Sequence, residues 1–207
     1  MTYRFYALLV LLLVLSPSGA ALSGVTGADA MRQSLPPELP DYRSDAIVIV
    51  DVSRQQLDYY RHGKWVQRYA VSTAEKGVGN AVDSFQTPLG LHYVARKIGA
   101  GEPINAIFRA RQPTGERATV ELAPRHLDED LVTSRIIWLA GLEEGVNRGP
   151  GVDSFERYIY IHGTPEEGLI GQPASHGCIR MKNADIIELF DQLPERALVW
   201  IIERSGG

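Results

Sequence analysis

From residue 45 onward, most apolar residues of this chain fall in short runs of strand length that are bounded by turn-forming residues. The first run, 46–52, is almost continuously apolar and β-branched, as expected of a strand that is covered on both faces. Similar runs recur at 56–60, 64–72, 91–97, 135–140, 157–161 and 197–203. The pattern predicts a mainly β fold in which the first four strands form a β-meander.

One segment near the C-terminus has helical spacing instead. Within 184–193 the apolar residues recur at intervals of three and four, at Ile186, Ile187, Phe190 and Leu193. Pro194 stops this helix, and Asn183 is the expected N-cap because its side chain can accept a bond from a free backbone N–H. The fold class predicted from these patterns is therefore mainly β (α+β), with one helix late in the chain.

The stretch 98–155 gives the weakest signal. Five of the fourteen residues in 141–154 are glycine or proline, which indicates a loop. Such an insertion could form a wall or lid beside a substrate, or it could be an ordinary surface excursion. The sequence leaves these two interpretations open.

The first twenty residues have the composition of a secretory signal peptide. Arg4 precedes an uncharged apolar run at 5–15, and the small residues Ser18, Gly19 and Ala20 precede the expected cleavage point. A membrane-spanning helix needs about 20 apolar residues, so this run is too short for an anchor. We predict export to the periplasm or cell wall, with no integral membrane segment after cleavage.

The rest of the chain suggests a spacer followed by one domain. Residues 21–44 are rich in Ala, Ser, Gly and Pro and lack a periodic apolar pattern, which is typical of a flexible spacer. A chain of 207 residues can bury one sizeable core. The expected organisation is a signal peptide at 1–20, a spacer at 21–44 and a folded domain at 45–203.

Composition argues against one class of partner. The chain has 21 Lys and Arg residues against 25 Asp and Glu residues, and its formal net charge is −4. Proteins that bind nucleic acids in general are basic instead, because they neutralise phosphates. We therefore expect no nucleic-acid partner.

Cys178 is the single cysteine of the chain, so no intramolecular disulfide can form. A lone thiol in an oxidising compartment is at risk of oxidation and mispairing. Nucleophilic chemistry is one reason for its presence, and burial as a small hydrophobic side chain is another. Composition alone leaves both explanations open.

A nucleophilic cysteine needs a base, because a thiol with a pKa of about 8.5 holds little thiolate at neutral pH. Two histidines are candidates. His176 lies two residues before Cys178, where side chains of an extended chain point the same way but need not meet. His162 ends a strand-like run, and the glycine-rich loop that follows can fold back and place its imidazole against the thiol. His162 is therefore the preferred base.

The residues around Cys178 supply further groups for acyl transfer. Segment 175–178 offers consecutive backbone N–H groups to an oxyanion, and Gly177 permits a conformation that other residues resist. Arg180 is expected on the same side of the chain, where its guanidinium can hold a substrate carboxylate. The alternative for Arg180 is an exposed side chain that pairs with Asp185 or Glu188.

These segments together resemble a known family. The motif Ile161-His162-Gly163-Thr164, followed by Ser175-His176-Gly177-Cys178-Ile179-Arg180-Met181, is similar to that of the L,D-transpeptidase (YkuD-type) family. The segments 49–57, 71–73 and 87–90 also resemble the family. The resemblance covers roughly residues 45–203.

The resemblance implies a β-sandwich enzyme that cleaves a peptidoglycan stem peptide beside a D-residue, forms a thioester and passes the acyl group to an amine. It implies Cys178 as nucleophile, His162 as base and the carbonyl of Gly163 as the group that orients His162. It further implies an oxyanion and substrate site formed by Ser175, His176, Gly177 and Arg180. Peptidoglycan stem peptides are the expected partners, and neither a cofactor nor a metal is implied.

Three alternatives remain at this point. Water could replace the amine, which would make the protein an L,D-carboxypeptidase or endopeptidase. The pocket could bind peptidoglycan without catalysis. His162, His176 and Cys178 could instead be zinc ligands, which would require all three side chains to converge on one ion.

Overall fold

The computed structural model describes residues 45–204, and most of its regular structure is β-strand. The expected signal peptide and spacer lie outside the described residues. Within the described part of the chain, no helix has the length and apolar character needed to cross a membrane. The fold class expected from the sequence, mainly β (α+β) with one α-helix after Cys178, is confirmed.

Ten strands, one α-helix and two short 3₁₀ helices make up the described fold. They are β1 (Ala46–Asp51), η2 (Val52–Arg54), β2 (Gln56–Arg61), β3 (Lys64–Ala70), β4 (Gly90–Ile98), β5 (Ala106–Arg109), β6 (Gln112–Arg117), β7 (Val132–Gly141), β8 (Tyr160–Gly163), η3 (Glu167–Leu169), β9 (Ile179–Met181), α2 (Asn183–Gln192) and β10 (Leu198–Ile202).

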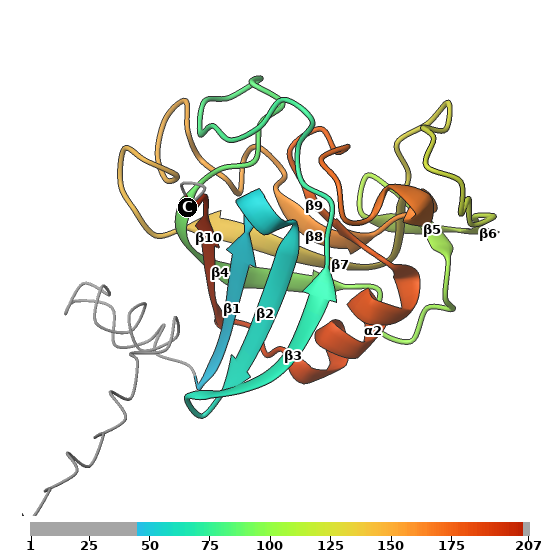
Figure 1. Ribbon diagram of the computed structural model, residues 1–207, viewed down its shortest axis with the longest axis horizontal. Helices are drawn as coiled ribbons and strands as arrows, with labels where there is room; N and C mark the ends of the chain where they lie inside the picture. The colour runs from blue at the N-terminus through green and yellow to red at the C-terminus, as the bar shows by residue number, and fades with distance from the viewer. Residues whose placement is uncertain (1–44, 205–207) are drawn as a thin grey trace, which may run out of the picture.

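The strands join in the order β3-β2-β1-β10-β4-β7-β5-β6, and β8 pairs with both β7 and β9. In Figure 1 the strands β1, β2 and β3 run steeply across the front, while β4, β7 and β8 lie across them behind. One apolar core, with Val48, Leu57, Ile137, Ile161 and Ile186 among its members, takes side chains from both groups of strands and from α2. The sheet therefore curls into two facing layers, which is the sandwich expected from the family resemblance.

The predicted β-meander is correct for β1, β2 and β3 and wrong for β4. β10 pairs with β1 in parallel, from Ile47 opposite Leu198 to Asp51 opposite Ile202, and β4 pairs with the other edge of β10. The C-terminal strand thus separates β4 from β1. Local patterning identifies strands, but it does not say which strand distant in sequence will be the neighbour.

The N-cap prediction for Asn183 is also wrong. Asn183 is the first residue of α2 and is buried, and the N-cap is Lys182 without a side-chain hydrogen bond. The Asn183 Oδ1 atom accepts hydrogen bonds from the hydroxyls of Thr133 and Ser134, and its Nδ2 donates to the carbonyl of Thr164. Asn183 therefore ties α2 to β7 and to the end of β8 rather than capping the helix.

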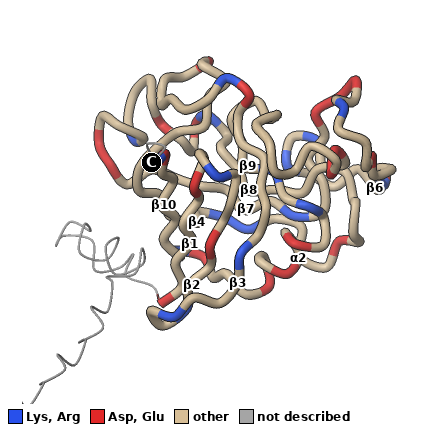
Figure 2. The backbone as a smooth tube through the Cα atoms, in the orientation of Figure 1, with Lys and Arg blue, Asp and Glu red and all other residues tan. Residues whose placement is uncertain are grey.

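The region of weakest sequence signal contains a hairpin that the patterning missed. β5 and β6 pair with each other, and β5 extends the sheet by pairing with β7. The strand expected at 157–161 begins later, at Tyr160, because a turn with Tyr158 at a positive φ of 58° precedes it. Figure 2 shows basic and acidic positions interspersed along the backbone of the described residues.

Candidate functional site

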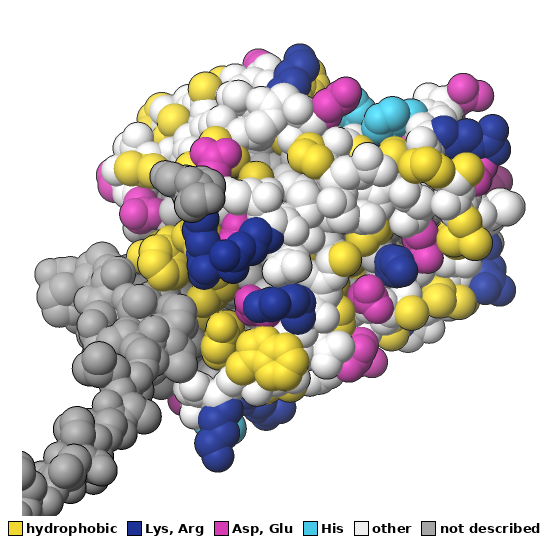
Figure 3. Space-filling model, viewed as in Figure 1, with side chains coloured by type: hydrophobic (Ala, Val, Ile, Leu, Met, Phe, Trp, Pro, Cys, Tyr) yellow, Lys and Arg dark blue, Asp and Glu magenta, His cyan; other side chains and the backbone are white. Residues whose placement is uncertain are grey.

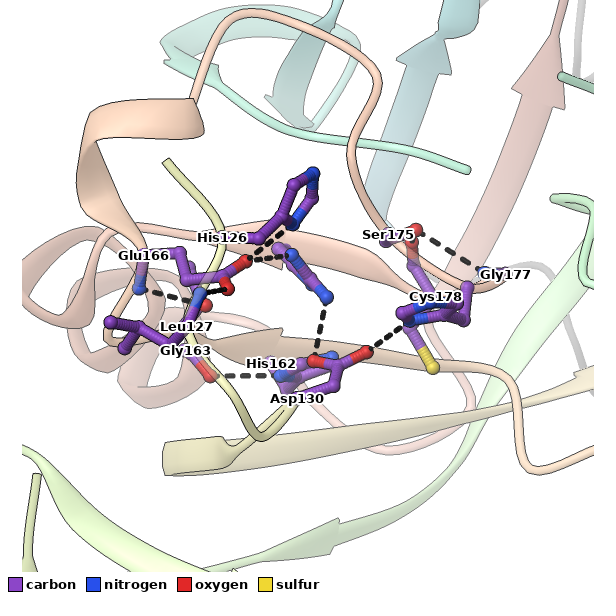
Figure 4. A network of polar contacts seen from close by, with 12 residues as sticks. His126, Leu127, Asp130, His162, Gly163, Glu166, Ser175, Gly177 and Cys178 are labelled. Atoms are coloured by element: carbon purple, nitrogen blue, oxygen red, sulfur yellow. Dashed lines mark hydrogen bonds and ion pairs between the residues drawn. The ribbon is translucent and has the colours of Figure 1, made fainter. Parts of the chain in front are cut away.

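The parallel pairing of β8 with β9 brings the predicted site residues together. Ile161 lies opposite Ile179, and His162 lies opposite Arg180. Ile161 and Ile179 point into the main core, so by alternation His162 and Arg180 face the other side of the ladder. The side chain of Cys178, directly before β9, packs on that side against the cluster that contains Tyr160. Cys178 and His162 therefore share one face of two neighbouring strands (Figure 4).

Cys178 is held by the start of β8. Its Sγ lies 3.4 Å from the backbone nitrogen of Tyr160, which donates to it, and 3.4 Å from the carbonyl oxygen of Tyr158, which accepts from the thiol. The side chain remains partly exposed. Its enclosure raises the pKa of the Cys178 thiol, although the Tyr160 N–H and the positive charge of Arg180 act in the opposite direction. At neutral pH the Cys178 side chain is therefore a thiol and not a thiolate.

His162 is 2% exposed, and its ring is oriented by its own strand. The Nδ1 atom lies 2.8 Å from the carbonyl oxygen of Gly163. Since a carbonyl can only accept, Nδ1 carries the proton and Nε2 is the basic nitrogen. Burial lowers the pKa of His162 to about 4, while Asp130 and the Gly163 carbonyl favour the charged form. His162 is therefore a neutral imidazole at neutral pH.

Asp130, in the segment before β7, joins the site although sequence analysis did not identify it. Its Oδ2 lies 2.8 Å from Nδ1 of His176, and its Oδ1 lies 2.7 Å from Nη2 of Arg180. Burial alone would raise the pKa of Asp130, but Arg180, His162 and His176 together hold it below the usual range. In the sequence Asp130 is one of several acidic residues at 128–130 before a strand, a pattern that usually marks a solvated surface.

Arg180 is not the exposed arginine considered as an alternative, because it is 1% exposed and does not pair with Asp185 or Glu188. Its Nη1 lies 2.6 Å from Oε2 of Glu166. Its Nη2 is at ion-pair distance from Asp130, but the angle between them is not that of a hydrogen bond. A buried guanidinium requires such counter-charges. A substrate carboxylate could reach Arg180 only after Asp130 moved, so the contact between Arg180 and substrate remains a prediction.

Glu166 extends this network to the segment that carries Asp130. It is 2% exposed, and its Oε1 accepts a hydrogen bond from the backbone nitrogen of Leu127 at 2.6 Å. Oε2 also lies 3.5 Å from Nδ1 of His126. Figure 4 shows these groups converging between the two loops. The loop after β8 thus fixes the segment that places Asp130 over the strand pair.

The segment predicted to form the oxyanion site is tightly bonded. The N–H of Ser175 donates to the carbonyl of Thr73, and the N–H of Gly177 donates to Oγ of Ser175 at 3.3 Å. Ser175 Oγ in turn donates to the Cys178 carbonyl at 2.6 Å. Gly177 has a φ of 130°, a conformation that favours glycine. Two of the expected donors are therefore engaged within the protein, and Ser175 and Gly177 fix the turn before the cysteine.

His176 is the exposed member of the predicted set. Its ring is bonded to Asp130, and its side chain points away from the core toward solvent. Figure 3 shows histidine and acidic side chains side by side at the upper right of the surface. The zinc alternative requires His162, His176 and Cys178 to converge. Instead, Nδ1 of His162 faces a carbonyl and Nδ1 of His176 faces Asp130. Residues 45–204 contain no group of His, Cys, Asp or Glu side chains arranged to hold a metal.

Two surface pockets lie near Tyr158, whose carbonyl accepts from the Cys178 thiol, and Cys178 itself lines neither of them. One, of about 240 Å³, is lined by Phe85, Arg157, Tyr158 and His176 among others. The other, of about 350 Å³, is lined by Arg111 and Trp138, whose side chains contact Tyr158.

Comparison with known proteins gives one family. The family model of the YkuD L,D-transpeptidase catalytic domain matches residues 45–201. No curated protein sequence matches this chain.

Several solved structures resemble the fold at low sequence identity. The L,D-transpeptidase from Mycobacterium smegmatis is 14% identical with a TM-score of 0.46, and the one from Xylanimonas cellulosilytica is 20% identical with a TM-score of 0.45. A cysteine-to-serine mutant of the Enterococcus faecium L,D-transpeptidase is 18% identical with a TM-score of 0.47. Each match covers 77% of this chain and, in the same order, 59%, 61% and 50% of the other chain.

Proposed function

Since this chain belongs to the L,D-transpeptidase (YkuD) family, we propose that it transfers the acyl group of a peptidoglycan stem peptide through a thioester on Cys178. His162 is the base in this proposal, and the carbonyl of Gly163 orients it. The observation that carries the proposal is that Cys178 and His162 occupy one face of the β8–β9 ladder, with Nδ1 of His162 held by a carbonyl. A thiol beside a neutral, oriented imidazole is the arrangement that general-base activation needs.

The acylation step follows from the protonation states. Nε2 of His162 accepts the thiol proton as Sγ attacks the scissile carbonyl, and an S–C bond forms while the carbonyl oxygen becomes an oxyanion. The imidazolium then donates its proton to the nitrogen of the leaving group as the C–N bond breaks. The thioester remains, and the amine product departs.

Asp130 and Gly163 stabilise the charged intermediate state in this mechanism. The imidazolium of His162 forms in a buried site, where a charge is costly. Asp130 and the Gly163 carbonyl both favour the charged ring, so they lower the cost of the proton transfer. Asp130 is therefore a positioning residue in the proposal, because it acts on the base and not on the reacting carbon.

The deacylation step decides the product. An amine acceptor attacks the thioester, gives its proton to Nε2 of His162 and restores the thiol, which makes a crosslink. The family to which the chain belongs supports the choice of an amine acceptor. Water in place of the amine would give a carboxypeptidase or endopeptidase. We further propose that the protein acts after export, in the periplasm or cell wall.

Mass spectrometry of the protein incubated with tetrapeptide muropeptides tests this proposal. We expect an acyl adduct on Cys178 together with released D-alanine, and crosslinked dimers if an amine is the acceptor. The Cys178→Ala variant should form neither adduct nor product. Products at the wild-type rate from Cys178→Ala would end the proposal. Binding of muropeptides without any adduct or product would favour a non-catalytic binding module.

A further inference from the structure

A group of four aromatic residues borders Cys178. The rings of Trp138 and Phe155 are stacked, with centroids 4.1 Å apart, and Tyr160 meets Trp138 edge-on at 5.4 Å. Tyr158 lies 5.6 Å from Trp138. We call Trp138, Phe155, Tyr158 and Tyr160 the aromatic platform. Cys178 packs against the apolar cluster that contains Trp138 and Tyr160. The aromatic platform therefore lies next to the Cys178 side chain.

Two arginine side chains lie on this platform. The guanidinium carbon of Arg111 is 5.1 Å from the Trp138 ring centroid and 4.8 Å from that of Tyr158. The guanidinium of Arg96 lies over Trp138 and Phe155, and the hydrogen bond to the Tyr160 phenol comes from Arg111. Among residues 45–204, no acidic side chain forms an ion pair with either arginine. Both guanidiniums therefore keep N–H groups available for an anion.

Arg111 is placed by an unfavourable backbone turn. β5 and β6 are joined at Ala110 and Arg111, whose φ angles are 48° and 68°. Residues with a Cβ avoid this left-handed region, and two-residue hairpin turns of this type usually contain Asn or Gly. Such local strain tends to occur where a side chain has a function. Here the turn directs Arg111 back over the platform.

Tyr160 connects Arg111 to the thiol. Its backbone nitrogen donates to Sγ of Cys178 at 3.4 Å, and its phenol oxygen lies 3.4 Å from Nη1 of Arg111. The guanidinium and the sulfur thus contact opposite ends of the same tyrosine. The pocket of about 350 Å³ between Arg96, Arg111 and Trp138 opens beside it.

We propose that Arg111 binds a free carboxylate of the acyl-donor peptide and thereby selects peptides that carry this group near the scissile carbonyl. The inference rests on the proposed function. Arg180, which the sequence suggested for this role, already has two carboxylate partners and is buried. Arg111 is partly exposed and stacked on aromatic rings, and its planar fork fits a carboxylate.

A pair of small alkylating reagents tests the charge of this subsite without any peptide. Iodoacetate and iodoacetamide react with the same thiolate, so the ratio of their rates at Cys178 cancels changes in thiolate content. We expect Arg111→Asn to lower the iodoacetate-to-iodoacetamide ratio about fivefold, because a nearby guanidinium attracts the anionic reagent. Asn suits the left-handed turn, and Arg111→Gln serves as a second variant if Arg111→Asn does not fold.

Arg96→Gln is the matched control, since it removes one positive charge from the same platform but leaves the hydrogen bond between Arg111 and Tyr160 in place. Its ratio should change less than about twofold if the effect belongs to the guanidinium that contacts Tyr160. An unchanged ratio in a folded Arg111→Asn or Arg111→Gln protein would overturn the proposal. An equal fall in Arg96→Gln would also overturn it, because the effect would then be general and not that of Arg111.

The second arm uses two donor peptides that differ only in whether the carboxylate is free or amidated. The wild type should prefer the free carboxylate, and Arg111→Asn should lose that preference mainly through KM. Turnover of both peptides with no preference in the wild type would refute the role of Arg111 and leave the proposed function intact. A shifted alkylation ratio with neither peptide used would support the anion subsite and refute the proposed function.

Discussion

The Nδ1 atom of His162 lies 2.8 Å from the carbonyl oxygen of its neighbour Gly163. A main-chain carbonyl thereby does what a carboxylate does in many catalytic triads: it fixes the tautomer and directs Nε2 outward. A carbonyl carries only a partial charge, so it stabilises an imidazolium less than a carboxylate would. Asp130 supplies the full negative charge nearby.

Replacing His162 should remove general-base catalysis while leaving the nucleophile in place. We expect His162→Ala to lower the rate of acyl-enzyme formation by about 10² to 10⁴-fold, as is typical for loss of a positioned base. Stopped-flow or quenched-flow mass spectrometry of the Cys178 adduct measures this rate. An unchanged rate would mean that another group takes the thiol proton.

Replacing Asp130 should act through the base. In Asp130→Asn the pKa of His162 is expected to fall, because the carboxylate that favours the imidazolium is removed. Acylation should slow, and its dependence on pH should change. An NMR titration of the His162 ring reads the shift directly. Asp128→Asn, in the same segment, is the control, and an equal shift in both variants would contradict a specific role of Asp130.

Stability should fall on mild acidification because two histidines are buried in the neutral form. Burial lowers the pKa of His92 and of His162 from 6.5 to about 4 each. Between these values the unfolded chain binds more protons, so the free energy of unfolding decreases as the pH falls from about 6.5 to about 4, by a few kcal/mol in total.

Urea unfolding at pH 7 and pH 5 measures this loss. His92 lies in β4, and its Nε2 lies 2.9 Å from Oγ of Ser154. His92→Gln should therefore reduce the pH dependence without removing the proposed base. A pH dependence that is the same in wild type and His92→Gln would show that His92 does not contribute.

The main expected effect of removing Arg180 is a lower free energy of unfolding, and not a direct loss of substrate binding. Arg180→Ala leaves the carboxylate of Glu166 buried without its partner, and breaking a buried pair in this way costs about 3 to 5 kcal/mol. Urea denaturation at pH 7 checks this. The double variant Arg180→Ala with Glu166→Gln should recover part of the loss. A fully stable Arg180→Ala protein with poor substrate binding would instead favour direct contact with substrate.

Much of the fold follows from local patterning. The run at 46–52 predicted β1, which the structure ends one residue earlier, and the helical spacing before Pro194 predicted α2. The sequence pattern did not predict the hairpin of β5 and β6. Its turn is Ala110-Arg111, which lacks the glycine or asparagine that such turns usually contain. Asn183 was misread as a cap because its tertiary partners Thr133 and Ser134 are distant in sequence.

Periodicity, turn residues and spacing predict most of the strands, the late helix, a cysteine and a histidine as candidates, and the family. These are local properties of the chain. The position of β10 beside β1, the contacts of Asp130 with His176 and Arg180, and the contact of Arg111 with Tyr158 depend instead on the tertiary structure. These contacts join segments that are distant in sequence and that only the packing of the whole core brings together. A local pattern of residues therefore does not predict which distant side chain will pair with a buried charge or lie over an aromatic ring.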